Sequence, residues 1–397
     1  MSQETFRKLR QMLMEKLDVY RELTDQEILD TIDELILDSL RESGVSLKEK
    51  VQLRQELFYS VRKLDVLQEL IEDETVTEIM VNGPDSIFVE RKGRLTKWTK
   101  SFTDQEKLED VIQQIVGKCN RIVNESSPIV DARLETGARV NVVIYPVALN
   151  GPILTIRRFP DKPITMEKLV ELGSVTSECA EFLEKLVRAR YSIIIGGGTG
   201  SGKTTFLGAL SEYIPKDERI ITIEDNAELK IQGIANLVRL EARAATVNGA
   251  PAVSIRDLIK SALRMRPDRI IVGEVRGGEA MDMLQALNTG HEGSLGTAHA
   301  NSSKDMLARL EIMTLMADLD LPLQAVRRQI ASGVDILIHL GRMRDRSRKL
   351  LEISEVCGYE DGEIVIQPLY QWQEENGLVK MEPLMHKEKL ERAGVKL

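Results

Sequence analysis

The chain has 397 residues, of which 42% are hydrophobic, and this is long enough for two or three domains that each bury a core. Asp and Glu (63) outnumber Lys and Arg (54), and the net charge of −9 argues against direct, general affinity for nucleic acid, whose phosphates favour a basic surface. The three isolated cysteines show neither zinc-binding nor disulfide spacing, and no apolar run approaches the ~20 residues that cross a bilayer, so we expect a cytoplasmic protein whose membrane contact is peripheral.

Helical spacing dominates the start of the chain. Apolar residues recur at helical intervals over residues 4–20 and 25–42. A third helix is expected to begin at Ser46, where Glu49 completes a possible capping box, and to continue through "VQLRQELFYSVRKLDVLQELIED". We interpret residues 1–45 as a helical extension, and we favour an ordinary bundle with solvated acidic faces over a dedicated docking module.

From about residue 76 the apolar pattern changes to the period of strands. The segment "VTEIMVNGPDSIFVERKGRLTKW" predicts a β-meander, a helix is expected over about 104–120, and "ARLETGARVNVVIYPVALNGPILTIRRF" predicts further strands. Residues 46–159 are therefore expected to form an α+β domain. The stretch 160–173 contains two prolines and ends in glycine, and it is the predicted linker.

Strands and helices alternate after the linker. Helices are expected over residues 176–190, 203–213, 254–264 and 278–289, and strands over 191–195, 219–223 and 269–273. This alternation is typical of a parallel sheet with helices on both faces. The predicted fold class is α/β, with a domain over residues 174–397 that follows the α+β domain and the helical extension.

The segment "IIIGGGTGSGKTTFLGAL" carries a phosphate-binding motif between a β-branched strand and an amphipathic helix. Its glycines let backbone N–H groups turn towards a β-phosphate, and the helix N-terminus adds positive potential. In such a motif the lysine reaches the β- and γ-phosphates and the hydroxyl that follows it binds Mg²⁺. We therefore predict a RecA-like P-loop domain that binds ATP and Mg²⁺. The predicted nucleotide-binding residues are Gly197, Gly198, Thr199, Gly200, Ser201, Gly202, Lys203, Thr204 and Thr205.

Carboxylates follow two of the predicted strands. Glu274 ends the strand in "RPDRIIVGEVRGGEA", at the edge where ligands lie in open α/β sheets. It is expected to orient the attacking water or to hold Mg²⁺ through a water, whereas a loop carboxylate paired with Arg276 is the alternative. Glu224 and Glu228 in "ITIEDNAELK" suit magnesium binding and water positioning, whereas acidic residues that stabilise a helix N-terminus are the alternative. The predicted magnesium ligands are Thr204, Glu224 and Glu274.

Two further segments carry chemistry-bearing side chains. His299 in "GTAHANSS" is expected to hydrogen-bond a γ-phosphate and report its loss, and a structural histidine is the alternative. The segment "HLGRMRDRSRKLLEI" places arginines at every second position from 342 to 348 between two apolar runs. We expect a solvated hairpin tip there, and docking to an acidic partner or to lipid headgroups is the alternative.

Together these segments resemble one family, the secretion ATPases that power type II secretion, type IV pili and type IV secretion. "LRMRPDRIIVGEVRG" is similar to the family's signature strand, which ends in Gly-Glu rather than in aspartate. Residues 224–228 resemble the family's Asp box, and "GTAHANS" resembles its His box. "EIMVNGPDSIFVERKGRL", "LTIRRF" and "GEVRGGEAMDMLQALNTGHEGS" are similar to the CpaF/TadA branch of tight-adherence (Flp) pilus assembly. The likeness covers about residues 60–360.

The resemblance implies a homohexameric ring that hydrolyses ATP and acts through a platform protein of the inner membrane. It also implies that Arg139 in "GARVN" and Arg157 in "TIRRF" reach the phosphates from the N-terminal domain, although surface arginines on strands are the alternative. The predicted catalytic set is Glu274, Glu224, Glu228, Lys203, His299, Arg139 and Arg157.

Three other functions remain open at this stage. The first is a motor for conjugation or DNA uptake from the same family. The second is a RecA-type nucleic-acid motor, against which the acidic charge argues. The third is a nucleotide-dependent switch that does not hydrolyse ATP.

Overall fold

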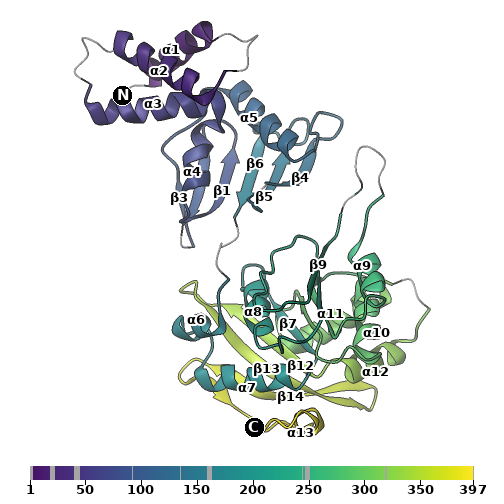
Figure 1. Ribbon diagram of the computed structural model, residues 1–397. Coiled ribbons are helices and arrows are strands. Elements are labelled where there is room, and N and C mark those ends of the chain that lie inside the picture. The colour runs from purple at the N-terminus through teal and green to yellow at the C-terminus, as the bar shows by residue number, and fades with distance from the viewer. Residues whose placement is uncertain are drawn as a thin grey trace. The chain divides into compact units, whose positions relative to one another are not determined.

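The structure is a computed structural model that describes residues 3–17, 23–39, 45–91, 93–134, 136–158, 163–243, 245, 251–317 and 320–396. The chain divides into two compact units, Met1–Pro160 and Asp161–Leu397. In Figure 1 the first unit is coloured purple to blue and the second teal to yellow. The ends of the two expected N-terminal helices (18–20 and 40–42) and the start of the expected linker (160–162) lie outside the described residues.

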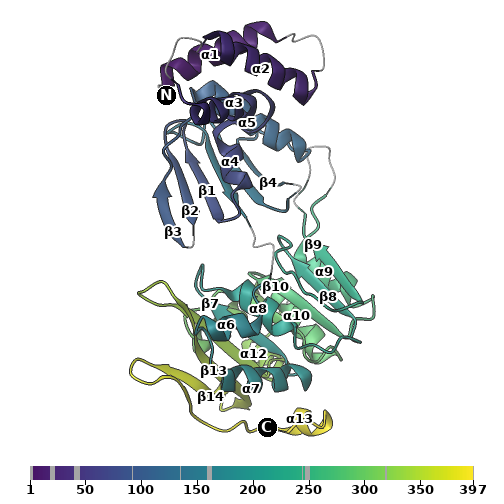
Figure 2. The ribbon, with the colours of Figure 1, turned by 60° about the vertical axis from the view of Figure 1, so that its left-hand side comes forward.

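The first unit begins with three packed helices, α1 (Gln3–Lys16), α2 (Asp25–Ser39) and α3 (Leu47–Arg62). Figure 2 shows α1 and α2 above α3. Leu13, Ile32 and Leu57 are fully buried between them, as the helical spacing of the apolar residues predicts. The capping box at the start of α3 is confirmed, because Ser46 Oγ accepts from the Glu49 N–H and the Glu49 carboxylate accepts from the Ser46 N–H.

The prediction of one continuous helix to about residue 73 is wrong. Helix α3 ends at Arg62, and the chain continues as a 3-10 turn, η1 (Asp65–Leu67), and a short helix, α4 (Gln68–Glu72). Asp65 adopts a left-handed conformation at the break (φ 52°). The break has a tertiary cause, because Leu67 and Leu70 are buried in the core under the strands that follow, whereas the buried face of α3 belongs to the three-helix core.

An antiparallel sheet completes the first unit in the strand order β3-β2-β1-β6-β5-β4. Val140 and Ile156 on one face of the sheet are buried in the same core as Val111 and Ile115 of α5 (Gln105–Lys118). The predicted α+β organisation of this region is therefore present. The strands are β1 (Val76–Asn82), β2 (Ile87–Arg91), β3 (Arg94–Lys97), β4 (Ile129–Arg133), β5 (Arg139–Val143) and β6 (Ile153–Arg157).

The second unit is built on a sheet of nine strands in the order β15-β14-β13-β12-β7-β11-β10-β8-β9. The pairs from β12 to β9 are all parallel, and this confirms the predicted parallel sheet. The remaining three strands extend it as an antiparallel ribbon that the sequence pattern did not predict in full. The strands are β7 (Ile193–Gly197), β8 (Ile220–Glu224), β9 (Leu237–Glu241), β10 (Arg269–Val275), β11 (Leu295–Ala298), β12 (Ile336–Arg342), β13 (Arg348–Glu360), β14 (Glu363–Gln373) and β15 (Gly377–Lys380).

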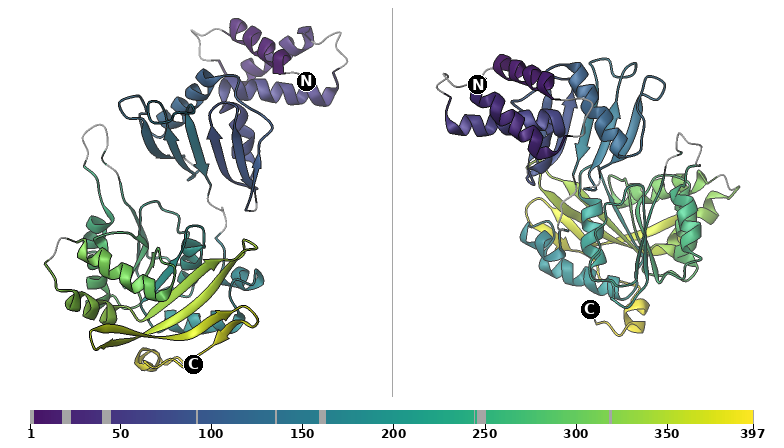
Figure 3. Two further views of the ribbon diagram at one scale, coloured as in Figure 1. Left: turned by 180° about the vertical axis from the view of Figure 1, so that it is seen from behind. Right: turned by 45° about the horizontal axis from the view of Figure 1, so that its top comes forward.

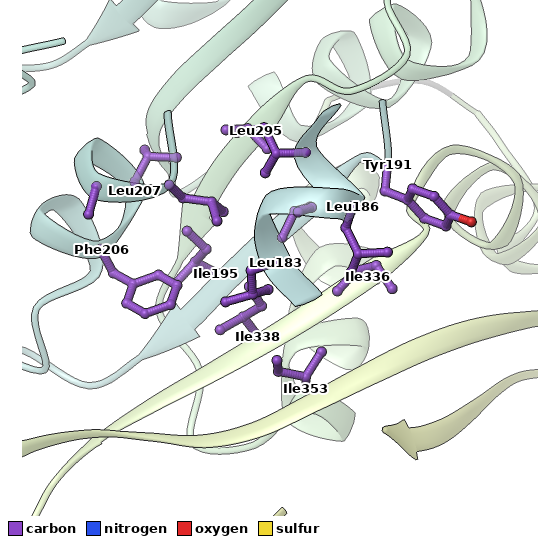
Figure 4. Packing of buried hydrophobic residues seen from close by; sticks show 14 of the residues in the cluster. Leu183, Leu186, Tyr191, Ile195, Phe206, Leu207, Leu295, Ile336, Ile338 and Ile353 are labelled. Atoms are coloured by element: carbon purple, nitrogen blue, oxygen red, sulfur yellow. The ribbon is translucent and has the colours of Figure 1, made fainter. Parts of the chain in front are cut away.

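Helices cover both faces of this sheet, as Figure 3 shows in the view from above. One face carries α6 (Met166–Glu171), α7 (Ser177–Arg188) and α8 (Lys203–Ser211). The other carries α9 (Ile255–Ala262), α10 (Glu279–Asn288), α11 (Ser303–Leu315) and α12 (Leu323–Gly333), and a short α13 (Glu388–Arg392) lies near the C-terminus. In Figure 4, Leu183 and Leu186 of α7 pack over Ile195, Ile336 and Ile338 of the central strands. The predicted α/β fold class is therefore confirmed.

Helix α6 lies inside the stretch that was expected to be a linker. Thr165 caps its N-terminus by accepting from the Lys168 N–H, and Met166 and Leu169 are buried in the core that also contains α7 and α8. Residues 163–173 therefore pack as part of the second unit, and the helix of the P-loop is one of their neighbours.

A fully buried ion pair anchors the start of β10. Arg269 is 0% exposed, and its guanidinium contacts both oxygens of the Glu218 carboxylate at 2.5 and 2.9 Å. The same guanidinium donates to the carbonyls of Val187 (2.7 Å) and Gly293 (3.3 Å). It therefore ties β10 to the end of α7 and to the loop before β11. Removing one partner of such a pair leaves a buried charge without compensation.

We expect Arg269→Met to lower the free energy of unfolding of the second unit by about 3–5 kcal/mol. Each unit contains one tryptophan, Trp98 or Trp372, so urea unfolding followed by fluorescence in a Trp98→Phe background reports on the second unit alone. The matched control is Arg188→Met, which removes an exposed pair with Glu184 and should cost about 0–1 kcal/mol. Equal unfolding midpoints for the two variants would contradict the anchoring role of Arg269.

Candidate nucleotide site

The phosphate-binding motif forms a turn between the central strand and a helix. All five residues of β7 are buried, the loop 198–202 follows at the carboxyl end of the strand, and α8 begins at Lys203. Gly202 precedes the helix in a left-handed conformation (φ 95°), which a residue with a side chain rarely adopts. The backbone N–H groups at the start of α8 are available to an anion, because a helix leaves its first N–H groups without intrahelical partners.

Lys203 is held on the backbone of the loop that precedes it. Its Nζ donates to the carbonyls of Gly197 (3.1 Å) and Gly198 (3.2 Å), and the residue is only 8% exposed. Burial lowers the pKa of Lys203, while the Glu274 carboxylate, whose Oε1 lies 3.9 Å from Nζ, partly offsets that effect. The ammonium group is therefore already at the loop that would hold the phosphates.

Three predicted site residues from separate elements meet at this edge of the sheet. The Nε2 atom of His299 lies 2.8 Å from Oε1 of Glu274, and its Nδ1 atom lies 3.5 Å from Nζ of Lys203. Burial, and then the charge of Lys203, lower the pKa of His299, so the neutral imidazole is favoured. The three side chains meet because β10 and β7 both pair in parallel with β11, which brings the carboxyl ends of these strands to one edge.

The alternative partner of Glu274 is present as well. Nε of Arg276 lies 2.5 Å from Oε2 of Glu274, and Nη1 of Arg276 lies 3.3 Å from the carboxylate of Asp225. The two oxygens of Glu274 therefore have different neighbours, since Oε1 faces Lys203 and His299 whereas Oε2 faces Arg276. Glu274 can therefore pair with Arg276 and still belong to the site, because the ion pair orients its carboxylate towards Lys203 and His299.

Glu224, at the end of β8, lies beside Gly273 of the neighbouring strand β10. Many P-loop proteins carry an aspartate at the position of this glycine. The Oε2 atom of Glu224 accepts from the N–H groups of Glu228 (2.8 Å) and Leu229 (2.9 Å), and the residue is only 2% exposed. Burial raises the pKa of Glu224 to about 7, although these backbone donors act in the opposite direction. A Cβ atom at Gly273 would lie 2.8 Å from Glu224 Cγ, so an aspartate at position 273 would displace this side chain.

The oxygen atoms around the loop fit a magnesium ion that is bound jointly with phosphate. Oε1 of Glu224 is buried and has no hydrogen-bond partner, and Thr204 lies in the first turn of α8. Among the residues that the structure describes, no group of three His, Cys, Asp or Glu side chains is arranged to hold a metal ion by itself. This combination suits Mg²⁺, which is commonly bound by one or two protein oxygens, substrate phosphates and water.

Arg139 and Arg157 lie in the other unit, on the face of its sheet opposite α5. They are direct cross-strand neighbours on β5 and β6, and Arg133 of β4 lies opposite Arg139 in the same row. Like charges in such pairs are unfavourable unless a counter-charge is present. Asp131 lies 3.6 Å from Arg139, and Glu78 is opposite Arg157, so the row is partly compensated. The arrangement presents several guanidinium groups that an anion could bind.

Sequence reasoning missed one residue at the loop. Arg348 was assigned to a hairpin tip, yet its Nε donates to the carbonyl of Gly200 (3.0 Å). The hairpin lies there because β12 pairs in parallel with β7, with Leu340 opposite Gly197. The alternating arginines were the only sequence signal, and they do not reveal which strand is the neighbour of β7.

The chain belongs to the family described as Type II/IV secretion system protein, whose sequence profile matches residues 61–373. A protein of Mycobacterium tuberculosis that is named for conjugal transfer is 36% identical over 320 residues, which cover 79% of this chain and 89% of that protein. The type IV secretion system protein PtlH of Bordetella pertussis is 32% identical over 324 residues, which cover 75% and 94% of the two chains. The names of both relatives, for conjugal transfer and for type IV secretion, agree with this family.

Solved structures share the fold. The crystal structure of the pilus retraction motor PilT with bound ADP aligns with a TM-score of 0.53 and 21% identity, over 83% of this chain and 86% of PilT. At this level of identity the likeness concerns the fold alone. Within the described part of the chain, no helix is both long enough and apolar enough to span a membrane.

We expect the stability of the second unit to depend on the ionisation of Glu224 when nucleotide and Mg²⁺ are absent. The carboxylate has a pKa of about 7 in the folded state against 4.5 for a free side chain, so its contribution to stability is present below pH 4.5 and is lost as the pH rises through 7. Glu224→Gln should therefore unfold at increasingly higher urea concentrations than the wild type as the pH rises from 5 to 8, with a gain on the order of 3 kcal/mol at pH 8.

The measurement is urea unfolding in the Trp98→Phe background at several pH values. The control is Glu391→Gln at an exposed position of α13, which should leave the pH dependence unchanged. Saturating Mg²⁺ and ADP should reduce the difference between Glu224→Gln and the wild type, because a bound cation favours the ionised carboxylate. A constant difference over the whole pH range would show that burial does not hold Glu224 neutral.

Proposed function

We propose that this chain hydrolyses Mg-ATP to ADP and phosphate and uses the energy for assembly of a pilus of the tight-adherence (Flp) type. The observation that carries the proposal is the convergence of Lys203, Glu274 and His299 at the P-loop, with Oε1 of Glu274 2.8 Å from Nε2 of His299 and 3.9 Å from Nζ of Lys203. Phosphoryl transfer to water depends chiefly on positioning and on stabilisation of charge, and these side chains supply both.

Each of the three side chains has a distinct proposed role. Lys203 neutralises charge on the β- and γ-phosphates. Glu274 accepts a hydrogen bond from the attacking water through Oε1, while its Oε2 stays paired with Arg276, which keeps the carboxylate in one orientation. His299 is favoured in its neutral form, in which Nε2 donates to Oε1 of Glu274 and Nδ1 faces Lys203. When nucleotide binds, this Nε2–H would turn to the γ-phosphate and leave Oε1 of Glu274 free for the water.

The acidic segment after β8 assists from the neighbouring strand. Glu224 and Thr204 are the proposed protein ligands of Mg²⁺, and Oε1 of Glu224 has no other partner. The bound cation would neutralise charge on the phosphates. Backbone donors from residues 228 and 229 hold the other oxygen of Glu224, so this carboxylate is positioned before any ligand arrives.

We propose a homohexameric ring as the working assembly, in which Arg139 and Arg157 reach the phosphates from the N-terminal domain. The row of arginines on the open face of β4, β5 and β6 supports this role, because an anion would relieve their mutual repulsion. The proposed domains are a helical extension (1–45), an α+β domain (46–159) and a RecA-like domain (174–397), with residues 163–173 packed as part of the last of these. Opening and closing of the two domains around the nucleotide would then follow hydrolysis.

The proposed location is the cytoplasmic face of the inner membrane, where the ring would act on a platform protein rather than on nucleic acid. The net charge of −9 argues against nucleic acid as the partner, and the similarity to a protein named for type IV secretion supports action in a secretion system. The segments similar to the CpaF/TadA branch support the pilus assignment within the family.

We expect Glu274→Gln to bind ATP and to hydrolyse it at least ~100-fold more slowly than the wild type, since the amide does not orient the attacking water as the carboxylate does. Turnover should be measured against protein concentration, with the oligomeric state read by light scattering at each point. Specific activity of the wild type should rise as rings form. The control is Glu279→Gln, which alters a nearby carboxylate that contacts the backbone of Arg276 instead of Lys203.

Normal hydrolysis by Glu274→Gln would move the catalytic role to Glu224 and Glu228. A wild type that binds ATP as a monomer and never turns it over would instead support a nucleotide-dependent switch without hydrolysis. The rate of ATP hydrolysis by the wild type alone distinguishes these two outcomes.

A motor for conjugation or for another type IV secretion system is the second candidate, and the names of the similar proteins from Mycobacterium tuberculosis and Bordetella pertussis favour it. In the organism of origin, we expect chromosomal Glu274→Gln to abolish surface pili and to leave the frequency of DNA transfer unchanged. The readouts are pilin in the sheared surface fraction and transconjugant counts. Loss of DNA transfer with normal pili would favour the second candidate.

A further inference from the structure

The arginine-rich hairpin between β12 and β13 contacts the P-loop through one exposed side chain, Arg348. Nε of Arg348 donates to the carbonyl of Gly200 at 3.0 Å. The stem of the same side chain lies against Gly202, where a Cβ atom would be 3.4 Å from Arg348 Cδ. Arg348 therefore crosses the loop that carries the phosphate-binding N–H groups. The nucleotide chemistry described above does not use this side chain.

The start of β13 is anchored on its other side. Nζ of Lys349 donates to the carbonyl of Gly173 at 2.5 Å, and the Leu350 N–H donates to the carbonyl of Ser174 at 2.9 Å. Leu350 is also 1% exposed and belongs to the core under α7 and α8. The backbone on which Arg348 is mounted is therefore held at two points, so the guanidinium needs little ordering to bind a ligand.

The strand order places Arg348 and the proposed γ-phosphate contacts on opposite sides of β7. Glu274 and His299 approach β7 from the side of β11 and β10, whereas Arg348 approaches from the side of β12 and β13. The γ-phosphate must lie near Glu274 and His299 if they act on it. The phosphate chain would then run back across the loop, with its α-phosphate towards the β12 side.

We propose that Arg348 binds the α-phosphate of the nucleotide, so that the β12–β13 hairpin forms part of the nucleotide site. Its Nε remains on Gly200, and the two terminal nitrogens of the guanidinium provide the donors for the phosphate oxygens. The inference rests on the proposed nucleotide site, and it adds a binding residue from a strand that follows the P-loop by about 145 residues.

The test is calorimetric binding of ADP and of the non-hydrolysable β,γ-imido analogue of ATP, with Mg²⁺, to the full chain. We expect Arg348→Met to raise the Kd of both nucleotides by the same factor, about tenfold, as the loss of one charge-assisted hydrogen bond predicts. The matched control is Arg344→Met, an exposed arginine of the same hairpin, which should leave both Kd values unchanged. The Kd of wild type for ADP should also rise more steeply with NaCl than that of Arg348→Met.

Three results would overturn the inference. Arg348→Met could bind both nucleotides as tightly as Arg344→Met does. It could lose affinity for the ATP analogue alone, which would assign the contact to the γ-phosphate. It could keep the wild-type salt dependence and melt at a lower temperature without nucleotide, which would show that Arg348 only supports the loop. If the wild type binds neither nucleotide, the proposed function fails first and this inference fails with it.

Discussion

The parallel pairing of β7 with β11 on one side and β12 on the other is the constraint on which the site depends. It places the P-loop in the middle of the sheet, with the ends of four neighbouring strands at the same edge. Helices then bury both faces of the sheet, and the apolar strand β7 has no exposed residue. The polar groups of the site are consequently mounted on buried strands, on the residues that follow them or on the first turn of α8, which limits their motion.

Burial also sets the electrostatics of this edge. Lys203, Glu274, His299 and Arg276 form a connected set in which each charge has an opposite neighbour or a backbone partner. Glu224 differs, because its carboxylate is nearly enclosed and one oxygen has no partner. The site thus combines a neutral His299 imidazole, a paired Glu274 and a Glu224 carboxylate with a pKa of about 7. A cation bound together with phosphate would supply the charges that these groups lack.

Gly273 illustrates how a local residue choice follows from a neighbouring strand. The side chain of Glu224 occupies the space that a side chain at 273 would need, so the carboxylate on β8 and the glycine on β10 depend on each other. In the sequence, glycine stands at position 273 of β10 instead of an aspartate. The fold shows that an acidic group is present at nearly the same place, supplied from the adjacent strand.

The sequence by itself determined the α/β class, the P-loop, the acidic and histidine segments and most element positions, because each of these depends on local periodicity or on short motifs. The prediction from the sequence failed at Asp65, where the helix ends because the residues before and after it are buried in two separate cores. Tertiary structure alone decided that Glu274 contacts His299 and that Glu224 lies against Gly273. No single segment of the sequence specifies the order of the strands in the sheet. The same holds for Arg348, which reaches the P-loop only because β12 is the neighbour of β7.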